Sequence, residues 1–206
     1  DFGFDFYAAQ GAANVGDPDK AILISWIGLP DNHYPTEPEE WEGSMTLPRE
    51  LRIVDEKLVQ TPISGIESLR VEEYPADGTF PSACEIGIET DGRDFELALF
   101  TKPDGSGGFT MKYDASQKTA VFDKSGMTKR FNENVGEVLP MPLEKPLQKI
   151  RVFVDHSSVE FFVNDGEATF TSHVYPERDE FHMSVSENAE MRIWKLRPSV
   201  EDRFVV

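Results

Sequence analysis

The feature that most constrains the fold is an apolar–polar alternation with a period of two, repeated along many short segments. In CEIGIE (84–89), FELALF (95–100) and FTMKY (109–113), apolar residues recur at every second position, as in a strand with one buried face. Turn signals punctuate the chain at ADG (76–78), TDG (90–92), PDGSGG (103–108) and NDG (164–166). Short strands separated by such turns predict an all-β fold, either a sandwich or a barrel.

The segment VFVDHSSVEFFVNDG (152–166) contains the three side-chain types of a nucleophilic triad at adjacent positions, Asp155, His156 and Ser157. Triad members usually come from separate segments whose side chains converge, whereas neighbours on a tight turn diverge. Apolar alternation flanks the DHSS stretch on both sides. Asp and Ser, which make up most of this stretch, form side-chain hydrogen bonds to their own backbone in turns. We therefore predict a hairpin here and no catalytic role for these residues.

Composition excludes several classes of partner. The 206 residues carry a formal net charge of -18, which disfavours binding to nucleic acid or to an anionic membrane surface. No apolar run approaches the roughly 18 residues of a membrane-spanning helix. The single cysteine, Cys84, cannot form a disulfide within the chain, and on a predicted strand it is expected to pack rather than to react.

The sequence predicts neither a metal site nor a cofactor. The four histidines, at 33, 156, 173 and 182, lack the i, i+4 spacing and the cysteine pairs of zinc sites. The GSGG stretch (105–108) is not followed by the Lys-Ser/Thr and helix of a phosphate-binding loop. It is expected to form a hairpin tip.

The first ten residues, DFGFDFYAAQ, bring Asp1, Asp5 and Tyr7 close together, ahead of an apolar strand that carries Trp26. Carboxylates beside aromatic rings suit a sugar, because the oxygens accept hydroxyl hydrogen bonds and the ring faces cover C–H surface. These four residues are the candidate substrate-binding residues. The alternative is that the aromatic residues are core and the aspartates cap strand ends, and composition leaves both open.

These stretches resemble glycoside hydrolase family 32, the β-fructosidases. DFGFDFYAAQ (1–10) and ILISWIGLPDNHYPTE (22–37) are similar to an active-domain strand pair and its loop, and W-x-G-x-MTLPREL (41–51) to the domain junction. KIRVFVDHSSVEFFVNDGEATFTSHVYP (149–176) resembles a signature of the accessory domain. The resemblance implies a C-terminal β-sandwich preceded by the last part of a five-bladed β-propeller. The expected boundary lies near residue 50, with residues 1–50 ending the propeller and 51–206 forming the sandwich.

The resemblance also implies that catalytic residues lie elsewhere. The family places its nucleophile in Asn-Asp-Pro-Asn-Gly, a stabilising aspartate in Arg-Asp-Pro and the acid/base in Glu-Cys-Pro, and none of these motifs occurs in this sequence. No residue is therefore assigned to catalysis. We expect the C-terminal portion of a longer retaining β-fructofuranosidase that hydrolyses sucrose, short fructo-oligosaccharides or sucrose 6-phosphate, with the missing N-terminal propeller as its partner. GLPDNHYPTE (28–37) resembles intracellular bacterial enzymes, which implies a cytoplasmic location.

Two other hypotheses concern the sandwich itself. It could be a non-catalytic carbohydrate-binding module, in which case Trp or Tyr should line an exposed face. It could instead be structural, bracing the propeller or a homo-oligomer, in which case its outward aromatic residues should lie at an interface. The sequence favours bracing, because no strand shows a regular row of solvent-facing aromatic residues.

Overall fold

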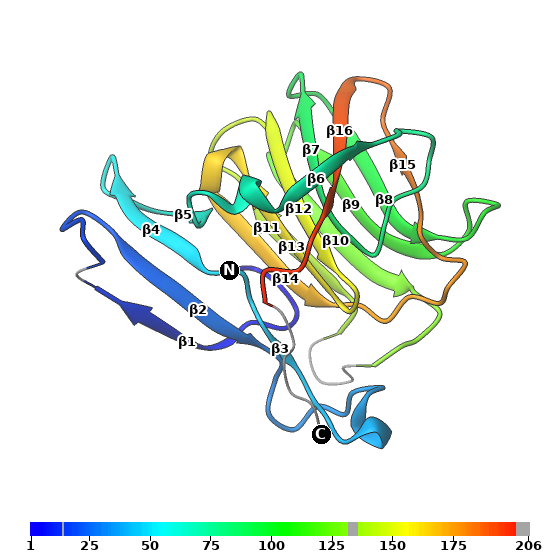
Figure 1. The fold of residues 1–206 in the computed structure, drawn as a ribbon. Helices are drawn as coiled ribbons and strands as arrows, with labels where there is room; N and C mark the ends of the chain where they lie inside the picture. The colour runs from blue at the N-terminus through cyan, green and yellow to red at the C-terminus, as the bar shows by residue number, and fades with distance from the viewer. Residues whose placement is uncertain (14, 132–135, 201–206) are drawn as a thin grey trace.

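The computed structural model describes residues 1–13, 15–131 and 136–200, and within these ranges the chain is built almost entirely from antiparallel β-strands. The described residues form three sheets, and their only helices are three short 3₁₀ turns. Figure 1 shows the first sheet, in blue and cyan, extending from one side of two larger sheets. This arrangement confirms the predicted all-β fold. Among the described residues, no helix is long and apolar enough to cross a membrane.

The first sheet is a blade of four main antiparallel strands and one short fifth strand. Its order is β1-β2-β4-β5, with a short strand β3 paired to the end of β2. The strands span Tyr7–Ala12 (β1), Ala21–Ile27 (β2), Ser44–Met45 (β3), Arg49–Val54 (β4) and Lys57–Pro62 (β5). A four-stranded antiparallel sheet in sequential order is the repeating unit of a β-propeller. We call this sheet the blade; its loop carries η1 (Glu37–Glu39).

The other two sheets form the sandwich. One has the order β11-β10-β9-β8-β15 and the other β14-β13-β12-β7-β16-β6. The first contains β8 (Phe95–Thr101), β9 (Gly108–Asp114), β10 (Thr119–Gly126), β11 (Val138–Pro142) and β15 (His182–Val185). The second contains β6 (Arg70–Tyr74), β7 (Ala83–Thr90), β12 (Lys149–Asp155), β13 (Ser158–Val163), β14 (Ala168–His173) and β16 (Ala189–Leu196). Short turns η2 (Ile66–Leu69) and η3 (Asn164–Gly166) precede β6 and β14.

The main core lies between the two sandwich sheets and is rich in phenylalanine. Phe122 of β10 stacks on Phe170 of β14 with ring centroids 3.7 Å apart and planes at 14°. Phe4, from the segment before the blade, packs edge-on against Phe170 at 5.3 Å. Gly3 permits this entry, because a Cβ there would lie 1.9 Å from the Thr171 carbonyl oxygen. The start of the chain is therefore anchored in the sandwich before β1 begins.

Several local predictions are confirmed. The 155–158 stretch is the turn of the β12–β13 hairpin, with Asp155 paired to Ser158 and His156 at a φ of 49°. PDGSGG connects β8 to β9, and the apolar 22–27 segment lies within β2. The boundary near residue 50 stays a prediction. In the structure the blade continues through β4 and β5 as far as Pro62.

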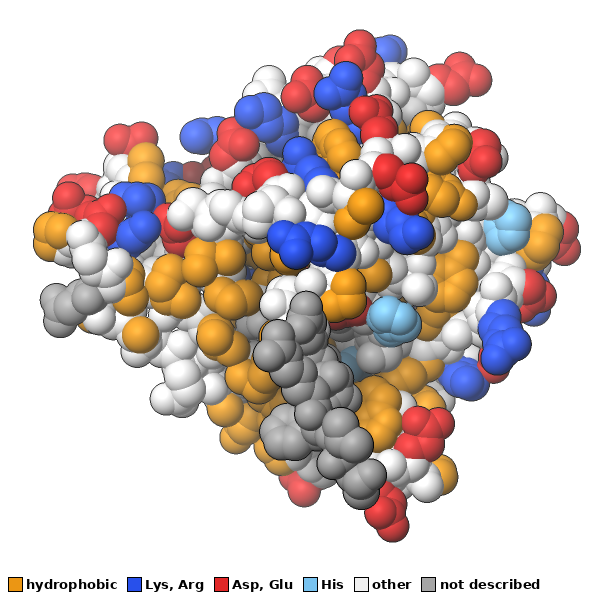
Figure 2. Space-filling view, in the orientation of Figure 1, with side chains coloured by type: hydrophobic (Ala, Val, Ile, Leu, Met, Phe, Trp, Pro, Cys, Tyr) orange, Lys and Arg blue, Asp and Glu red, His pale blue; other side chains and the backbone are white. Residues whose placement is uncertain are grey.

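The blade carries exposed apolar side chains. The large ones are Tyr7, Met45, Ile53, Val54 and Leu58. Figure 2 shows hydrophobic side chains gathered over the left and lower part of the molecule, where the blade lies in Figure 1. All six residues of β1 are exposed, and within the blade this strand pairs with β2 alone. The blade therefore presents the faces and the edge that adjacent blades would cover in a propeller.

Candidate functional site

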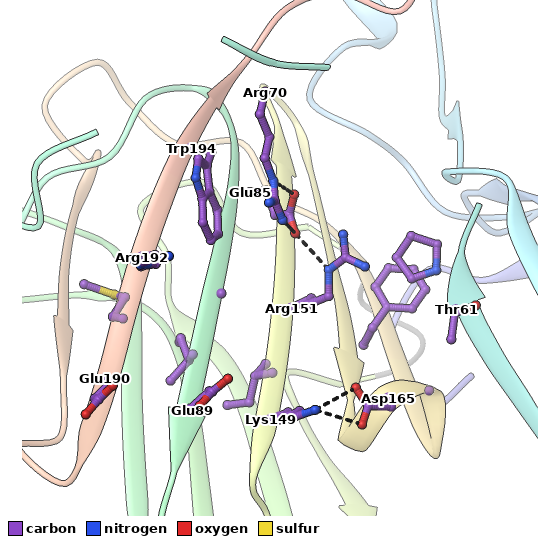
Figure 3. A pocket seen from close by; sticks show the side chains of 17 residues that line it. Thr61, Arg70, Glu85, Glu89, Lys149, Arg151, Asp165, Glu190, Arg192 and Trp194 are labelled. Atoms are coloured by element: carbon purple, nitrogen blue, oxygen red, sulfur yellow. Dashed lines mark hydrogen bonds and ion pairs between the residues drawn. The ribbon is translucent and has the colours of Figure 1, made fainter. Parts of the chain in front are cut away.

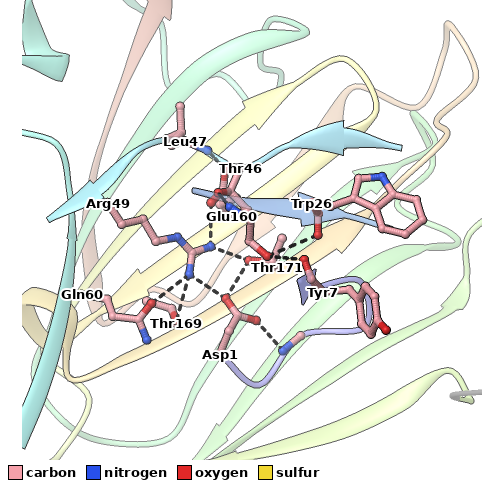
Figure 4. A network of polar contacts seen from close by, with 12 residues as sticks. Asp1, Tyr7, Trp26, Thr46, Leu47, Arg49, Gln60, Glu160, Thr169 and Thr171 are labelled. Carbon is pink, nitrogen blue, oxygen red and sulfur yellow. Dashed lines mark hydrogen bonds and ion pairs between the residues drawn. The ribbon is translucent and has the colours of Figure 1, made fainter. Parts of the chain in front are cut away.

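Arg49, the first residue of β4, lies at the centre of a buried polar network between the blade and the sandwich (Figure 4). Its Nη1 donates to Asp1 Oδ2 at 2.8 Å, and its Nη2 donates to Glu160 Oε2 at 2.7 Å. Nη2 also donates to Thr171 Oγ1 at 2.6 Å, and that hydroxyl in turn donates to Asp1 Oδ2 at 2.7 Å. The side chains of Arg49 and Asp1 are fully buried. Asp1 is therefore oriented by one residue from the blade and one from the sandwich.

Glu160 completes the network from β13, the strand next to the edge strand β14 of the six-stranded sheet. Its Oε1 accepts the backbone N–H of Leu47 at 2.7 Å, so one carboxylate holds both the β3–β4 connection and Arg49. Burial raises the pKa of Glu160, and the charge of Arg49 opposes that rise. Phe6 and Phe162 flank the guanidinium at 5.0 and 5.1 Å from its Cζ to their ring centroids. Water is thus excluded from an ion pair that ties the two parts of the chain together.

Asp5 belongs to a second buried cluster. Its Oδ1 accepts the Tyr34 hydroxyl at 3.1 Å, and its Oδ2 accepts the backbone N–H of His173 at 2.9 Å. Lys124 Nζ lies 3.9 Å from Oδ2. Burial raises the pKa of Tyr34, and the nearby Asp5 carboxylate adds to the rise. The imidazole of His173 lies 2.7 Å from the carbonyl oxygen of Ile27, at the end of β2. This cluster fixes the loop of the blade to the edge of the sandwich.

Tyr7 and Trp26 lie together on the blade. They pair across β1 and β2, and their rings meet edge to face with centroids 6.2 Å apart. Tyr7 is 47% exposed, and Trp26 is partly exposed. Gly43 makes room for the indole, because at its φ of +69° a Cβ would lie 1.9 Å from Trp26 Nε1. The two rings form an aromatic corner whose shape is set by the surrounding backbone.

The structure therefore separates the four candidate residues. Tyr7 and Trp26 form the aromatic corner, whereas Asp1 and Asp5 lie in two different networks that face the sandwich. Sequence reasoning missed Arg49 and Glu160, which hold Asp1. A signal was present, because Glu160 is the one charged residue in the strand SVEFFV, whose other residues after Ser158 are apolar. A charge in such a strand needs a partner when it is buried.

Two other candidates show no arrangement suited to catalysis. Asp155 and His156 contact each other at 2.8 Å, but their side chains are 79% and 73% exposed on the hairpin turn. Such exposure gives little electrostatic control of a proton transfer. Cys84 is fully buried in the core, and burial raises the pKa of its thiol. Among the described residues, no cluster of His, Cys, Asp or Glu could hold a metal ion.

Two family profiles match this sequence and together span most of it. Residues 1–62 match the profile described as the glycosyl hydrolases family 32 N-terminal domain, and residues 52–198 match that described as glycosyl hydrolases family 32 C terminal. The chain belongs to glycoside hydrolase family 32. This membership confirms the expected fold, in which the last part of a β-propeller precedes a β-sandwich.

Individual family 32 members agree with this assignment. A sucrose-6-phosphate hydrolase of Vibrio alginolyticus is 35% identical over 178 residues, which cover 85% of this chain and 36% of the relative. A sucrose-6-phosphate hydrolase of Staphylococcus xylosus is 32% identical over 191 residues, covering 87% of this chain and 38% of the relative. The chain thus spans little more than a third of the length of these relatives.

Solved family 32 structures superimpose on nearly the whole chain. A sucrose-6-phosphate hydrolase from Lactobacillus gasseri matches with a TM-score of 0.86 at 27% identity, covering 96% of this chain and 42% of the other. A Bombyx mori β-fructofuranosidase of the family matches with a TM-score of 0.79 at 25% identity, covering 98% and 42%. The blade and the sandwich are therefore matched together within single larger proteins.

Proposed function

We propose that this chain is the C-terminal portion of a retaining β-fructofuranosidase that hydrolyses sucrose or short fructo-oligosaccharides. Sucrose 6-phosphate is the alternative candidate for its substrate. The observation that carries the proposal is the joint match of blade and sandwich to family 32 proteins named sucrose-6-phosphate hydrolases. A retaining glycosidase needs two carboxyl groups about 5–5.5 Å apart, a nucleophile and an acid/base. In this proposal both belong to the upstream propeller, and the enzyme acts in the cytoplasm.

Within that enzyme, residues 1–50 end the propeller and residues 51–206 form a sandwich that braces it. The Arg49 network supports bracing, because it joins a blade residue to Glu160 and Thr171 of the sandwich through short, buried contacts. The exposed faces of the blade support an upstream propeller, since all six residues of β1 are exposed and Met45 of β3 is 61% exposed on this chain. Blades of this kind pack face to face in a propeller.

Each candidate residue has a role in the proposal. Tyr7 and Trp26 form part of the wall of the sugar site, where an aromatic corner covers C–H surface of the substrate. Asp1 and Asp5 stand four residues apart just before β1, and their carboxylates already accept hydrogen bonds from the protein. We assign them the task of fixing the start of β1, and with it Tyr7, relative to the sandwich.

The test compares this chain with its parent protein. Purified parent protein should release fructose from sucrose, and this chain alone should release none, because the covalent route requires both absent carboxylates. Rates on sucrose and sucrose 6-phosphate would then decide between the two substrates. Sustained fructose release by the chain after repurification, or a parent protein inactive on all fructosides, would overturn the proposal.

A further inference from the structure

A groove of about 630 Å³ runs across the outer face of the six-stranded sheet (Figure 3). Its floor is formed by β7, β12 and β16, and β5 and η3 contribute the opposite wall through Thr61, Asp165 and Gly166. The volume lies within the range of small-molecule sites, about 300–1,000 Å³. Tyr7 and Trp26 do not line this groove, which lies on the sandwich and the last strand of the blade.

The groove contains one indole in a fixed position. Trp194 of β16 stands beside Gly87 of β7, where an added Cβ would lie 3.1 Å from the ring atom Cζ3. The guanidinium of Arg70 lies over one face of the ring, with its Cζ 3.8 Å from the centroid. Trp194 nevertheless stays partly exposed. A ring held in this way loses little conformational freedom when a ligand stacks on it.

Polar groups beside the indole are also held in place. Arg70 Nε and Nη2 donate to the two oxygens of Glu85 at 2.9 and 2.8 Å, and Arg151 Nε donates to the same carboxylate at 2.8 Å. Glu85 is fully buried between them. Farther along the groove, Lys149 Nζ lies 3.2 Å from Asp165 Oδ2. The remaining N–H groups of these side chains are donors at defined positions.

The charge of the groove selects the class of ligand. Arg70, Lys149, Arg151 and Arg192 are balanced by Glu85, Glu89, Asp165 and Glu190 among the lining residues. The groove is formally neutral in a chain of net charge -18. A phosphate or a carboxylate ligand would need an excess of positive charge, and an apolar ligand would leave the donors without partners. A neutral molecule with many hydroxyls and one C–H face satisfies both the donors and the indole.

We propose that this groove binds a neutral oligosaccharide, which stacks on Trp194 and accepts hydrogen bonds from Arg151, Lys149 and Arg192. The sandwich would then hold sugar as well as brace the blade. Binding requires no hydrolysis, so this inference stands apart from the proposed catalytic function. If the parent enzyme is active but no oligosaccharide binds in this groove, only the groove proposal is overturned and the proposed catalytic function stands.

The test follows the indole N–H signals of this chain by NMR. The three tryptophans, Trp26, Trp41 and Trp194, are assigned with single Trp→Phe variants, and the probes are 1-kestose and maltotriose. We expect a saturable shift of the Trp194 signal at millimolar concentrations of one of these trisaccharides. The Trp41 signal should not move, because Trp41 does not line the groove. No saturable shift with either trisaccharide, or a saturable shift confined to Trp26, overturns the proposal.

Two variants measure the contribution of the indole. Trp194→Ala should weaken binding of the responding trisaccharide by about tenfold or more, and Trp41→Ala should leave it unchanged as the matched control. Equal affinity of Trp194→Ala and the native chain would overturn the assignment. Tighter binding of sucrose 6-phosphate than of sucrose at the Trp194 signal would overturn the choice of a neutral ligand. The NMR shift on the native chain decides the matter even if Trp194→Ala folds poorly.

Discussion

Arg49 of the blade and Glu160 of the sandwich form an ion pair with 2.7 Å between Nη2 and Oε2, and their side chains are 0% and 5% exposed. Neither charge can be solvated if the other is removed. Thr171 and Leu47 supply further hydrogen bonds to the same two groups. The buried pair therefore favours the relative position of blade and sandwich that keeps both charges paired.

The first prediction concerns this pair. Glu160→Ala should lower the free energy of unfolding by about 3–5 kcal/mol, because it removes one of the two buried carboxylates that pair with the Arg49 guanidinium and leaves Nη2 without its charged partner. The matched control is Glu72→Ala, which removes an exposed partner 3.5 Å from Lys195 and should cost less than about 1 kcal/mol. Urea denaturation of the two variants measures the difference. Equal losses would show that the interface does not depend on this pair.

A second prediction addresses the aromatic corner. Trp26→Ala in the parent enzyme should lower kcat/KM for fructosides by about tenfold or more, since about 1.4 kcal/mol of transition-state contact corresponds to that factor. The unfolding of the sandwich should stay unchanged, because Trp26 lies on the blade. Native kinetics in this variant would reduce Trp26 to a packing residue.

His156→Ala provides the third prediction. The His156 imidazole is exposed on the β12–β13 turn, and in the described structure its ring contacts Asp155. Activity of the parent enzyme should be retained, with a loss of stability within about 1 kcal/mol. Kinetics and urea denaturation should be measured on the same preparation. Lost activity in a variant of native stability would restore a catalytic role to this turn.

Amide hydrogen exchange on demonstrably monomeric chain tests the division into blade and sandwich. Residues 20–30 should exchange faster than residues 150–163, because the blade strands are half-buried whereas β12 and β13 lie in the core. Comparable protection in the two segments would mean that the blade belongs to a self-sufficient domain. The predicted boundary near residue 50 would then be wrong.

A pH prediction follows from Asp91, whose carboxylate accepts hydrogen bonds from the Asn188 amide and from Arg93. The Asn188 bond contributes most, and together these bonds lower the pKa of Asp91 from 3.8 to about 2. Because the folded value lies below the unfolded one, the stabilisation is present above about pH 3.8 and is lost as the pH falls towards 2. NMR titration of the Asp91 carboxyl carbon measures the shift. A midpoint at the ordinary value would contradict it.

The sequence predicted the local structure well because alternation and turn residues act over a few positions. The β12–β13 hairpin and the β8–β9 tip follow from such signals. The alternation also places Glu85 on the outward face of β7, where a solvent-exposed residue would be expected. Glu85 is instead fully buried, because Arg151 on the adjacent strand β12 and Arg70 on β6, two strands away, both cover it. Contacts of this kind depend on which strands become neighbours, and periodicity carries no information on that.

The same limit applies to the candidate site. Proximity along the chain grouped Asp1 with Tyr7, because Asp1 lies six residues before Tyr7, the first residue of β1. The carboxylate of Asp1 nevertheless turns to Arg49 and Thr171, which lie 48 and 170 positions away. Only the tertiary structure reveals that the carboxylates of Asp1 and Asp5 accept hydrogen bonds at the interface between blade and sandwich. It also shows that Tyr7 and Trp26 lie together on the blade.

The Arg49 network also sets an order of events during synthesis. Glu160, Thr169 and Thr171 follow Arg49 by 111, 120 and 122 positions. At about 10 residues per second, a ribosome takes roughly ten seconds to make that stretch. Throughout this interval the Arg49 guanidinium has none of these three partners, and the blade cannot lock into place. Strands made late in synthesis, β13 and β14, thus supply the partners of a residue in the early strand β4. A chain released before β14 emerges would be a substrate for chaperones or proteases.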